Sequence, residues 1–126
     1  MRKGFTLVEM LVVITVLLIL LGMAIPAVVR AKIAANDTSA KTILRTVSNA
    51  AEWYSNVNAA YPTSEAQLVG ASPAYLNKSY CAQTLTGYDV TCTFTSGSYT
   101  LTAVPVTVGS TGTTTYTITT GGVLTP

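Results

Sequence analysis

Residues 1–26 read MRKGFTLVEMLVVITVLLILLGMAIP. A short basic segment ends at Gly4, and a predominantly apolar run then extends from Phe5 to Ile25 with Glu9 as its single charged residue. As an α-helix, this run is long enough to cross the roughly 30 Å hydrocarbon core of a bilayer. A carboxylate inside such a segment is energetically costly, so Glu9 is a candidate functional residue.

This arrangement resembles the N-terminus of a type IV prepilin or a type II secretion pseudopilin. The resemblance rests on residues 4–9, GFTLVE, together with the basic residues before them and the apolar run after them. It implies that a prepilin peptidase cuts between Gly4 and Phe5, and that the new amine of Phe5 is methylated. It also implies that Glu9 guides filament assembly. We expect Glu9 to pair with the amine on Phe5 of a neighbouring subunit, because an unpaired carboxylate is not tolerated in an apolar filament core.

Two other interpretations of this segment stay open. Arg2 and Lys3 place the N-terminus on the cytoplasmic side by the positive-inside rule. Glu9 then lies about one turn inside the membrane, where it suits the helix dipole and is alternatively a tolerated interfacial residue. The segment is alternatively an ordinary secretory signal peptide with the small residues near 22–24 as its cleavage site. Against that, the apolar run is longer than a typical signal-peptide core, and the helical pattern continues through the proposed cut.

One long helix is predicted from about Phe5 to about Asn58. Gly22 and Pro26 predict a kink, because proline removes a backbone donor and clashes with the preceding turn. The second half of the helix is amphipathic, and its apolar stripe predicts packing against a sheet. The stripe comprises Ile33, Ile43, Leu44, Val47, Ala51, Tyr54 and Val57. Charged residues, including Asp37 and Glu52, are assigned to other faces, and the polar run 36–39 is a place where the helix can loosen.

From Tyr88 onward the apolar residues alternate with a period of two, which predicts an antiparallel β-meander of three or more strands. Residues 59–87 are predicted to form a loop, with a helical turn at Ser64–Leu68 that Ser64 caps. The fold class is therefore α+β, and the resemblance implies the pilin fold. Its parts are a leader at 1–4, a transmembrane and filament-core helix at 5–29, and a globular head at 30–126. The head contains helix to about 58, the loop at about 59–87 and the sheet at about 88–126.

Cys81 and Cys92 are the two cysteines of the chain. If the apolar segment exports the residues beyond it, both cysteines lie in an oxidising compartment and pair. We expect this disulfide to tie the loop after the helix to the first strand of the sheet. The alternative is two free buried thiols in a cytosolic protein.

The composition argues against several function classes. The 126 residues include seven Lys/Arg, five Asp/Glu and no histidine, and removal of the leader leaves five basic and five acidic side chains. DNA binding is therefore possible but not supported by charge. No catalytic constellation is present in the sequence, so we predict no enzyme activity and no cofactor. We also predict no metal site, because residues 104–116 carry no carboxylate for calcium.

The predicted function is a structural subunit of a type IV pilus, assembled by packing of N-terminal helices. The alternatives are a type II secretion pseudopilin, a minor pilin that binds DNA or a surface, and a membrane-anchored enzyme. The expected partners are copies of the same chain, the prepilin peptidase, the inner-membrane assembly machinery and, before assembly, the membrane. The expected location is the inner membrane as a prepilin, then an extracellular pilus or a periplasm-spanning pseudopilus.

Threonines cover the outer face of the predicted sheet, which suggests a neutral surface, packing of the head against copies of itself, or modification of the hydroxyl groups. Two segments, Asn36-Asp37-Thr38 and Asn77-Lys78-Ser79, match the N-glycosylation tripeptide.

Overall fold

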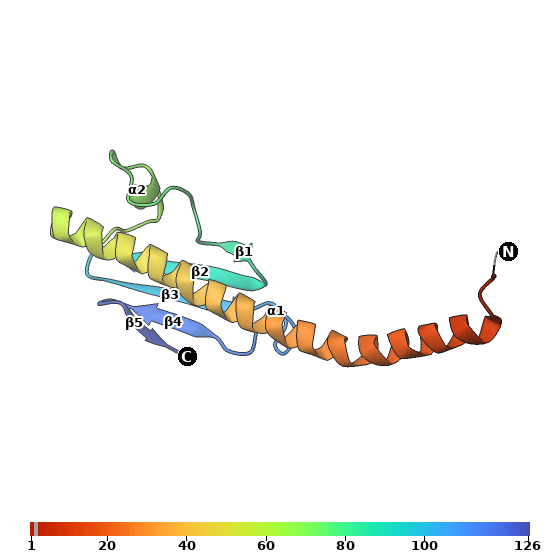
Figure 1. Ribbon diagram of the computed structural model, residues 1–126. Coiled ribbons are helices and arrows are strands. Elements are labelled where there is room, and N and C mark those ends of the chain that lie inside the picture. The colour runs from red at the N-terminus through yellow and green to blue at the C-terminus, as the bar shows by residue number, and fades with distance from the viewer. Residues whose placement is uncertain (2) are drawn as a thin grey trace. The chain divides into compact units, whose positions relative to one another are not determined.

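The computed structural model describes Met1 and residues 3–126, so Arg2 of the predicted basic leader lies outside the described residues. One long helix precedes a short helix and a sheet (Figure 1). The elements are α1 (Leu7–Asn58), α2 (Ala66–Val69), β1 (Gln83–Leu85), β2 (Tyr88–Thr95), β3 (Ser98–Pro105), β4 (Tyr116–Thr119) and β5 (Val123–Thr125). The predicted α+β class, with one long N-terminal helix and an antiparallel sheet, is confirmed.

The chain divides into two compact units, Met1–Lys32 and Ile33–Pro126. In the first unit, every Leu, Ile, Val, Met and Phe from Phe5 to Val29 is exposed. This part of α1 is long and apolar enough to cross a membrane. Helix α1 continues through Gly22 and Pro26, and the predicted kink there stays a prediction.

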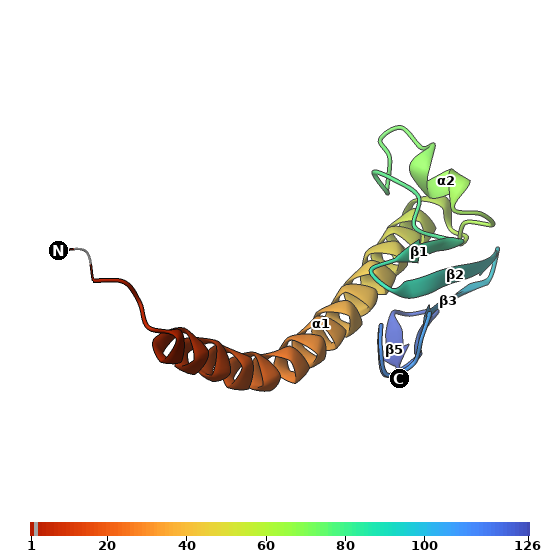
Figure 2. The same ribbon diagram turned by 90° about the vertical axis from the view of Figure 1, so that its right-hand side faces the viewer.

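In the second unit, the sheet has the order β1-β2-β3-β4-β5, and every neighbouring pair is antiparallel. Figure 2 shows β1 and β2 side by side in this sheet. The prediction that the sheet begins at Tyr88 is wrong, because β1 lies within the predicted loop. The chain after Gly122, predicted as a tail, forms β5. Each of these edge strands has three residues, which is too short to show an alternating pattern.

The core of the second unit lies between the sheet and α1. The sheet contributes Tyr88, Val90, Tyr99, Leu101, Ala103, Tyr116 and Ile118, and α1 contributes Ala40, Leu44, Val47, Ala50 and Ala51. Alternate residues of β2 and β3 face this core, and threonines face outward. The predicted stripe is correct for its central residues, but Val57 is exposed. Ala51 is the last buried residue of α1, so Val57 lies beyond the covered stretch of the helix.

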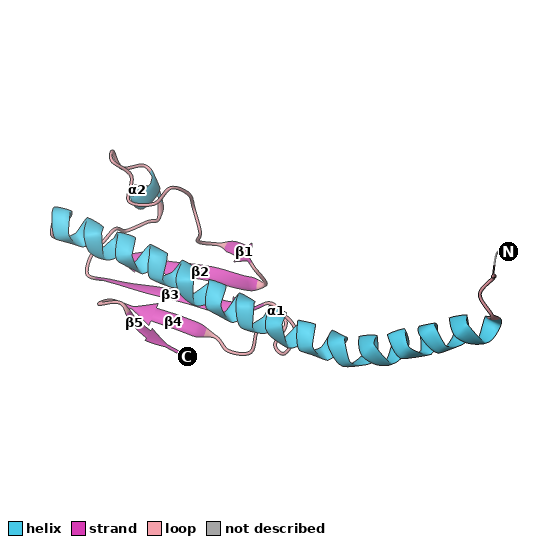
Figure 3. Ribbon diagram, viewed as in Figure 1, coloured by secondary structure: helices cyan, strands magenta, loops and turns pink. Residues whose placement is uncertain are grey.

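Long loops join α1 to the sheet and β3 to β4 (Figure 3). Helix α1 ends at Asn58, and Ala59 adopts a left-handed φ of 56° that terminates it. The helix does not loosen at residues 36–39. The predicted helical turn occurs as α2, but Glu65, not Ser64, occupies its N-cap position.

Candidate functional site

The N-terminus of α1 is closed by a reciprocal pair of hydrogen bonds between Thr6 and Glu9. The backbone N–H of Thr6 donates to Oε2 of Glu9 at 2.8 Å, and the backbone N–H of Glu9 donates to Oγ1 of Thr6 at 3.2 Å. The Thr6 hydroxyl also donates to Oε2 of Glu9 at 2.7 Å. This is a capping box, which satisfies backbone donors that the first helical turn leaves free.

The capping box fixes where the Glu9 carboxylate lies. Glu9 lines one shallow hollow together with Lys3, Gly4 and Phe5. The two residues of the predicted cleavage site and the predicted assembly carboxylate therefore lie close together. The sequence analysis included Thr6 in the resemblance but missed its capping role, although the Thr-x-x-Glu spacing is the signal that reveals such a cap.

Gly4 is not required by the fold of this chain. A Cβ added at Gly4 meets no heavy atom within 4 Å, and its φ is not in the left-handed region. If a glycine is needed here, the requirement therefore comes from a partner that binds this segment.

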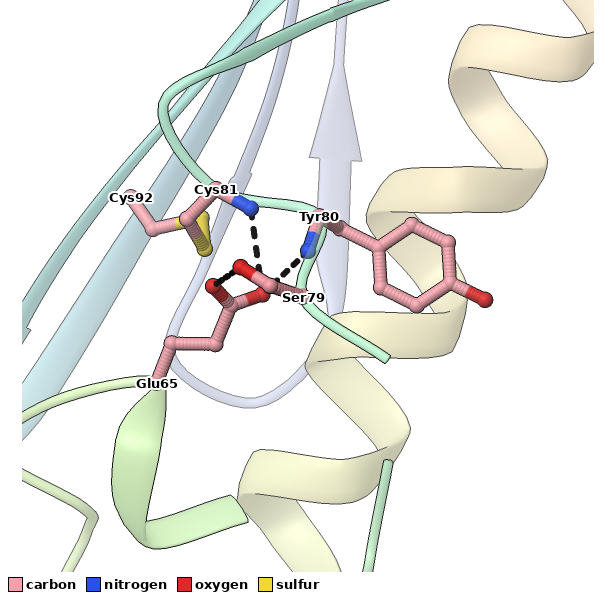
Figure 4. Close-up of a disulfide and its surroundings, with 5 residues drawn as sticks. All are labelled: Glu65, Ser79, Tyr80, Cys81 and Cys92. Carbon is pink, nitrogen blue, oxygen red and sulfur yellow. Dashed lines mark hydrogen bonds between the residues drawn. A yellow bond between two sulfur atoms is a disulfide. The ribbon is translucent and has the colours of Figure 1, made fainter. Parts of the chain in front are cut away.

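The loop between α2 and β1 is fixed by a disulfide and a carboxylate (Figure 4). Cys81 and Cys92 are bonded, with their Cα atoms 5.5 Å apart. Cys92 lies on β2, so the bond reaches the second strand of the sheet and not the first, which corrects the prediction. Glu65 accepts from the backbone N–H groups of Tyr80 at 2.6 Å and Cys81 at 3.0 Å, and from the hydroxyl of Ser79. The carboxylate thus holds the chain that carries Cys81.

A second carboxylate, Asp37, fastens the β3–β4 loop to α1. It accepts from the phenol of Tyr88 at 2.5 Å and from the hydroxyl of Thr113 at 2.9 Å, and Asn36 donates to the Thr111 carbonyl at 2.8 Å. Burial opposes ionisation of Asp37, but the bonds from Tyr88 and Thr113 outweigh it and lower the pKa of Asp37. Burial and the Asp37 carboxylate raise the pKa of Tyr88 to about 12.

A third carboxylate, Glu52, fastens the turn between β4 and β5. It accepts from the phenols of Tyr99 at 2.7 Å and Tyr61 at 3.0 Å, and from the backbone N–H of Gly121 at 2.8 Å. Burial opposes ionisation here too, but the bonds from Tyr99, Gly121 and Tyr61 outweigh it and lower the pKa of Glu52. Assigning Asp37 and Glu52 to faces away from the sheet was wrong, because both carboxylates bond to tyrosines of the sheet.

These three carboxylates have a structural role, because they hold loops of the head in place through hydrogen bonds. Among Met1 and residues 3–126, no three His, Cys, Asp or Glu side chains gather in a way that could hold a metal ion. Asp37, Glu52 and Glu65 each accept several hydrogen bonds from the head itself. The arrangement therefore favours a rigid head, carried on an exposed apolar helix with a capped N-terminus.

These features define a class of protein: a small α+β head on an N-terminal helix that is apolar enough to enter a membrane. A family described as the prokaryotic N-terminal methylation motif matches residues 1–25. The chain is 30% identical over 107 residues to the type IV wide pilus major component PilA4 of Thermus thermophilus, a match that covers 82% of each chain.

The chain belongs to the type IV pilin family and is a structural subunit of a pilus. This family consists of structural subunits and is not an enzyme family. The methylation motif and the similarity to a pilus component suggest prepilin processing and self-assembly, and they fit a membrane-anchored precursor and an extracellular fibre.

Proposed function

We propose that this chain is made as a prepilin, is cut between Gly4 and Phe5, is methylated on Phe5, and polymerises through α1 into a type IV pilus. The proposal divides the chain into a leader at 1–4, a membrane and filament-core helix at 5–29, and a head at 30–126. The observation that carries it is that every Leu, Ile, Val, Met and Phe side chain from Phe5 to Val29 is exposed. Such a surface needs lipid before assembly and other helices afterwards.

Leaving lipid for a helix bundle yields little hydrophobic free energy, because lipid is as apolar as leucine. Direction and register must then come from packing and from polar groups. Glu9 is the acidic side chain of the segment 5–29, and cleavage creates a positive amine on Phe5. We propose that Glu9 pairs with this amine on a neighbouring subunit. The capping box supports this role, since it holds the carboxylate at the end of the helix that a neighbour's amine approaches.

Before assembly, the same capping box supplies hydrogen bonds to the carboxylate within its own chain. The unassembled subunit can therefore remain in the membrane without a cationic partner for Glu9 from another chain. Assembly then adds the neighbour's amine to a carboxylate that is already positioned, so little side-chain ordering is needed on contact.

We propose a pilus subunit in preference to a type II secretion pseudopilin. Similarity to a pilus component supports this choice, as does the absence of carboxylates from residues 104–116 in the sequence. The proposed partners are the prepilin peptidase and the inner-membrane machinery that extracts the subunit. A role in gripping DNA is not proposed, because Lys78 is the only Lys or Arg after Arg45.

Intact mass and N-terminal sequencing of filaments sheared from the native host test this proposal. The expected result is a chain that begins at Phe5 and carries one extra methyl group. A mature chain that begins at Ile25 would establish the signal-peptide interpretation. Recovery of the chain only as an unprocessed membrane protein would refute polymerisation.

A further inference from the structure

A groove on the second unit is walled by the only tryptophan of the chain. Its volume is about 300 Å³, and its lining residues are Thr46, Asn49, Ala50, Trp53 and Tyr75. Trp53 is 71% exposed. Tyr75 is held in place by a bond from its N–H to the carbonyl of Leu68 at 2.9 Å and by the edge of the Tyr54 ring, with the ring centres 5.6 Å apart. We call these five lining residues the Trp53 groove.

A separate apolar ridge lies where β3 runs into the β3–β4 loop. Val104, Val106 and Val108 occupy alternate positions and are 42%, 52% and 73% exposed. The ridge is anchored, because the N–H of Val106 donates to the carbonyl of Gly87 at 3.0 Å and Val108 forms a bridge with Gly112. We call these three residues the valine ridge.

The two surfaces cannot meet within one head. The loop that carries Val108 is bonded to α1 at Asn36 and Asp37, whereas the groove lies at residues 46–53 of the same helix. Between nine and 17 helical residues separate the two attachment points from the groove residues of α1, which corresponds to about 14–26 Å at a rise of 1.5 Å per residue. Each surface is therefore free to receive a part of another copy.

We propose that the valine ridge of one copy seats in the Trp53 groove of the next copy along the pilus. The inference rests on the proposed function, since it requires that the chain polymerises. Contact between two different surfaces of identical subunits is heterologous, and such contacts propagate into open filaments when the rotation does not close. Neighbouring heads in contact are then displaced along α1 by about 14–26 Å.

The chemistry of the two surfaces suits this pairing. The groove offers two aromatic rings with an amide and a hydroxyl, and the ridge offers three branched aliphatic side chains. Apart from the Tyr75 phenol, these eight residues carry no ionisable group, so burying them removes no charge from water. Exposed tryptophans that become buried in a well-packed pocket commonly dominate an interface.

A cysteine pair in the full-length chain tests the contact directly. Asn49→Cys and Val106→Cys are introduced together, the chain is assembled into filaments, and the filaments are oxidised and separated without reductant. The native Cys81–Cys92 pair is already bonded and provides no free thiol. A ladder of covalent oligomers is expected. The matched control is Asn49→Cys with Thr119→Cys, which places the second thiol on the exposed face of β4, outside the ridge, and should give no ladder.

The fluorescence of Trp53 gives a second readout that needs no substitution. Seating in the groove should shift its emission to shorter wavelength and reduce quenching by iodide when the wild-type chain assembles. Val106→Asp should lower the filament yield about tenfold or more, equivalent to at least 1.4 kcal/mol per contact, whereas Thr119→Asp should have little effect.

The outcomes separate the two proposals. Wild-type filaments with no ladder from the Val106 pair, or with Trp53 as open to iodide as in the monomer, would overturn this contact and leave the proposed function standing. A chain that forms no filaments at all would refute the proposed function, and this contact with it.

Discussion

Replacing Tyr99 by phenylalanine tests how α1 is fastened to the sheet. The Tyr99 phenol is almost fully buried. It donates to Oε1 of Glu52 at 2.7 Å, lies 2.8 Å from Oγ of Ser48, and accepts from the N–H of Gly122 at 3.2 Å. Phenylalanine keeps the packed ring and removes only this oxygen, so the change isolates the polar contacts.

The expected loss of unfolding free energy in Tyr99→Phe follows from these hydrogen bonds. A hydrogen bond to a charged group contributes about 1.5–3 kcal/mol, and we take the lower end because Glu52 is only partly buried. The loss also leaves the buried hydroxyl of Ser48 without this partner, which adds on the order of 1 kcal/mol. We therefore expect Tyr99→Phe to lower the free energy of unfolding by about 2–3 kcal/mol, a large fraction of the total stability of a small domain.

Urea unfolding of a fragment that begins at Arg30 measures this cost. We expect this fragment to be a soluble monomer, because it lacks the apolar helix. Tyr61→Phe is the matched control: it removes a more exposed phenol from the same Glu52 carboxylate and should cost less than half as much. Equal losses for the two variants, or a loss below about 0.5 kcal/mol for Tyr99→Phe, would refute the reasoning.

The pH dependence provides an independent check. Burial, with the neighbouring Glu52, raises the pKa of Tyr99 from 10.0 to about 12. A raised pKa of an acidic group means that the folded state holds the proton more tightly than the unfolded state. The associated stability is present in full below pH 10 and is lost as the pH rises toward 12. The difference between wild type and Tyr99→Phe should therefore shrink over this range, and a constant difference would contradict the assignment.

Three further predictions concern processing and packing. Gly4→Val should block removal of the leader, because this chain leaves open space at Gly4 and the proposed peptidase should not accept a branched side chain there, and intact mass would show the uncut precursor. Replacing the Cys81–Cys92 pair by serines should cost about 3 kcal/mol by chain entropy, and non-reducing peptide mapping of exported protein should find the linked peptide. Gly112→Ala should cost about 1–3 kcal/mol in urea unfolding, because its Cβ would overlap the phenol of Tyr88, whereas Gly97→Ala, with open space, should have little effect.

Long periodic patterns made most of the fold predictable. The apolar run after Gly4 and the alternation in β2 and β3 each extend over eight residues or more, so their periods are visible in the sequence. Strands β1 and β5 have three residues each and exist because a longer neighbouring strand pairs with them, which is a tertiary effect. No local pattern marks such a strand.

The hydrogen bonds of Asp37 and Glu52 to the sheet could not be predicted from the sequence, for a different reason. Asp37 reads as a solvent-facing helix residue, because its partner Tyr88 lies 51 residues away in the sequence. The sequence gives no sign of the Glu52 contact either, since its partner Tyr99 lies 47 residues away. Only the Thr6–Glu9 cap is local, and its spacing was available in the sequence. Contacts that depend on tertiary packing become visible only when the helix and the sheet are placed together.

The yield of sheared filament relative to mature protein in the membrane, measured for Glu9→Leu in cells without a wild-type copy, tests the central claim most directly. We expect normal processing and insertion but little filament, because removing the carboxylate favours the membrane and leaves the Phe5 amine of a neighbour unpaired in an apolar core. Thr6→Ala is the matched control, since it removes the hydroxyl of the capping box and keeps the carboxylate. It should assemble far better than Glu9→Leu. Wild-type filament yield from Glu9→Leu, or equal losses from both variants, would contradict the charge pair and reduce Glu9 to a helix cap.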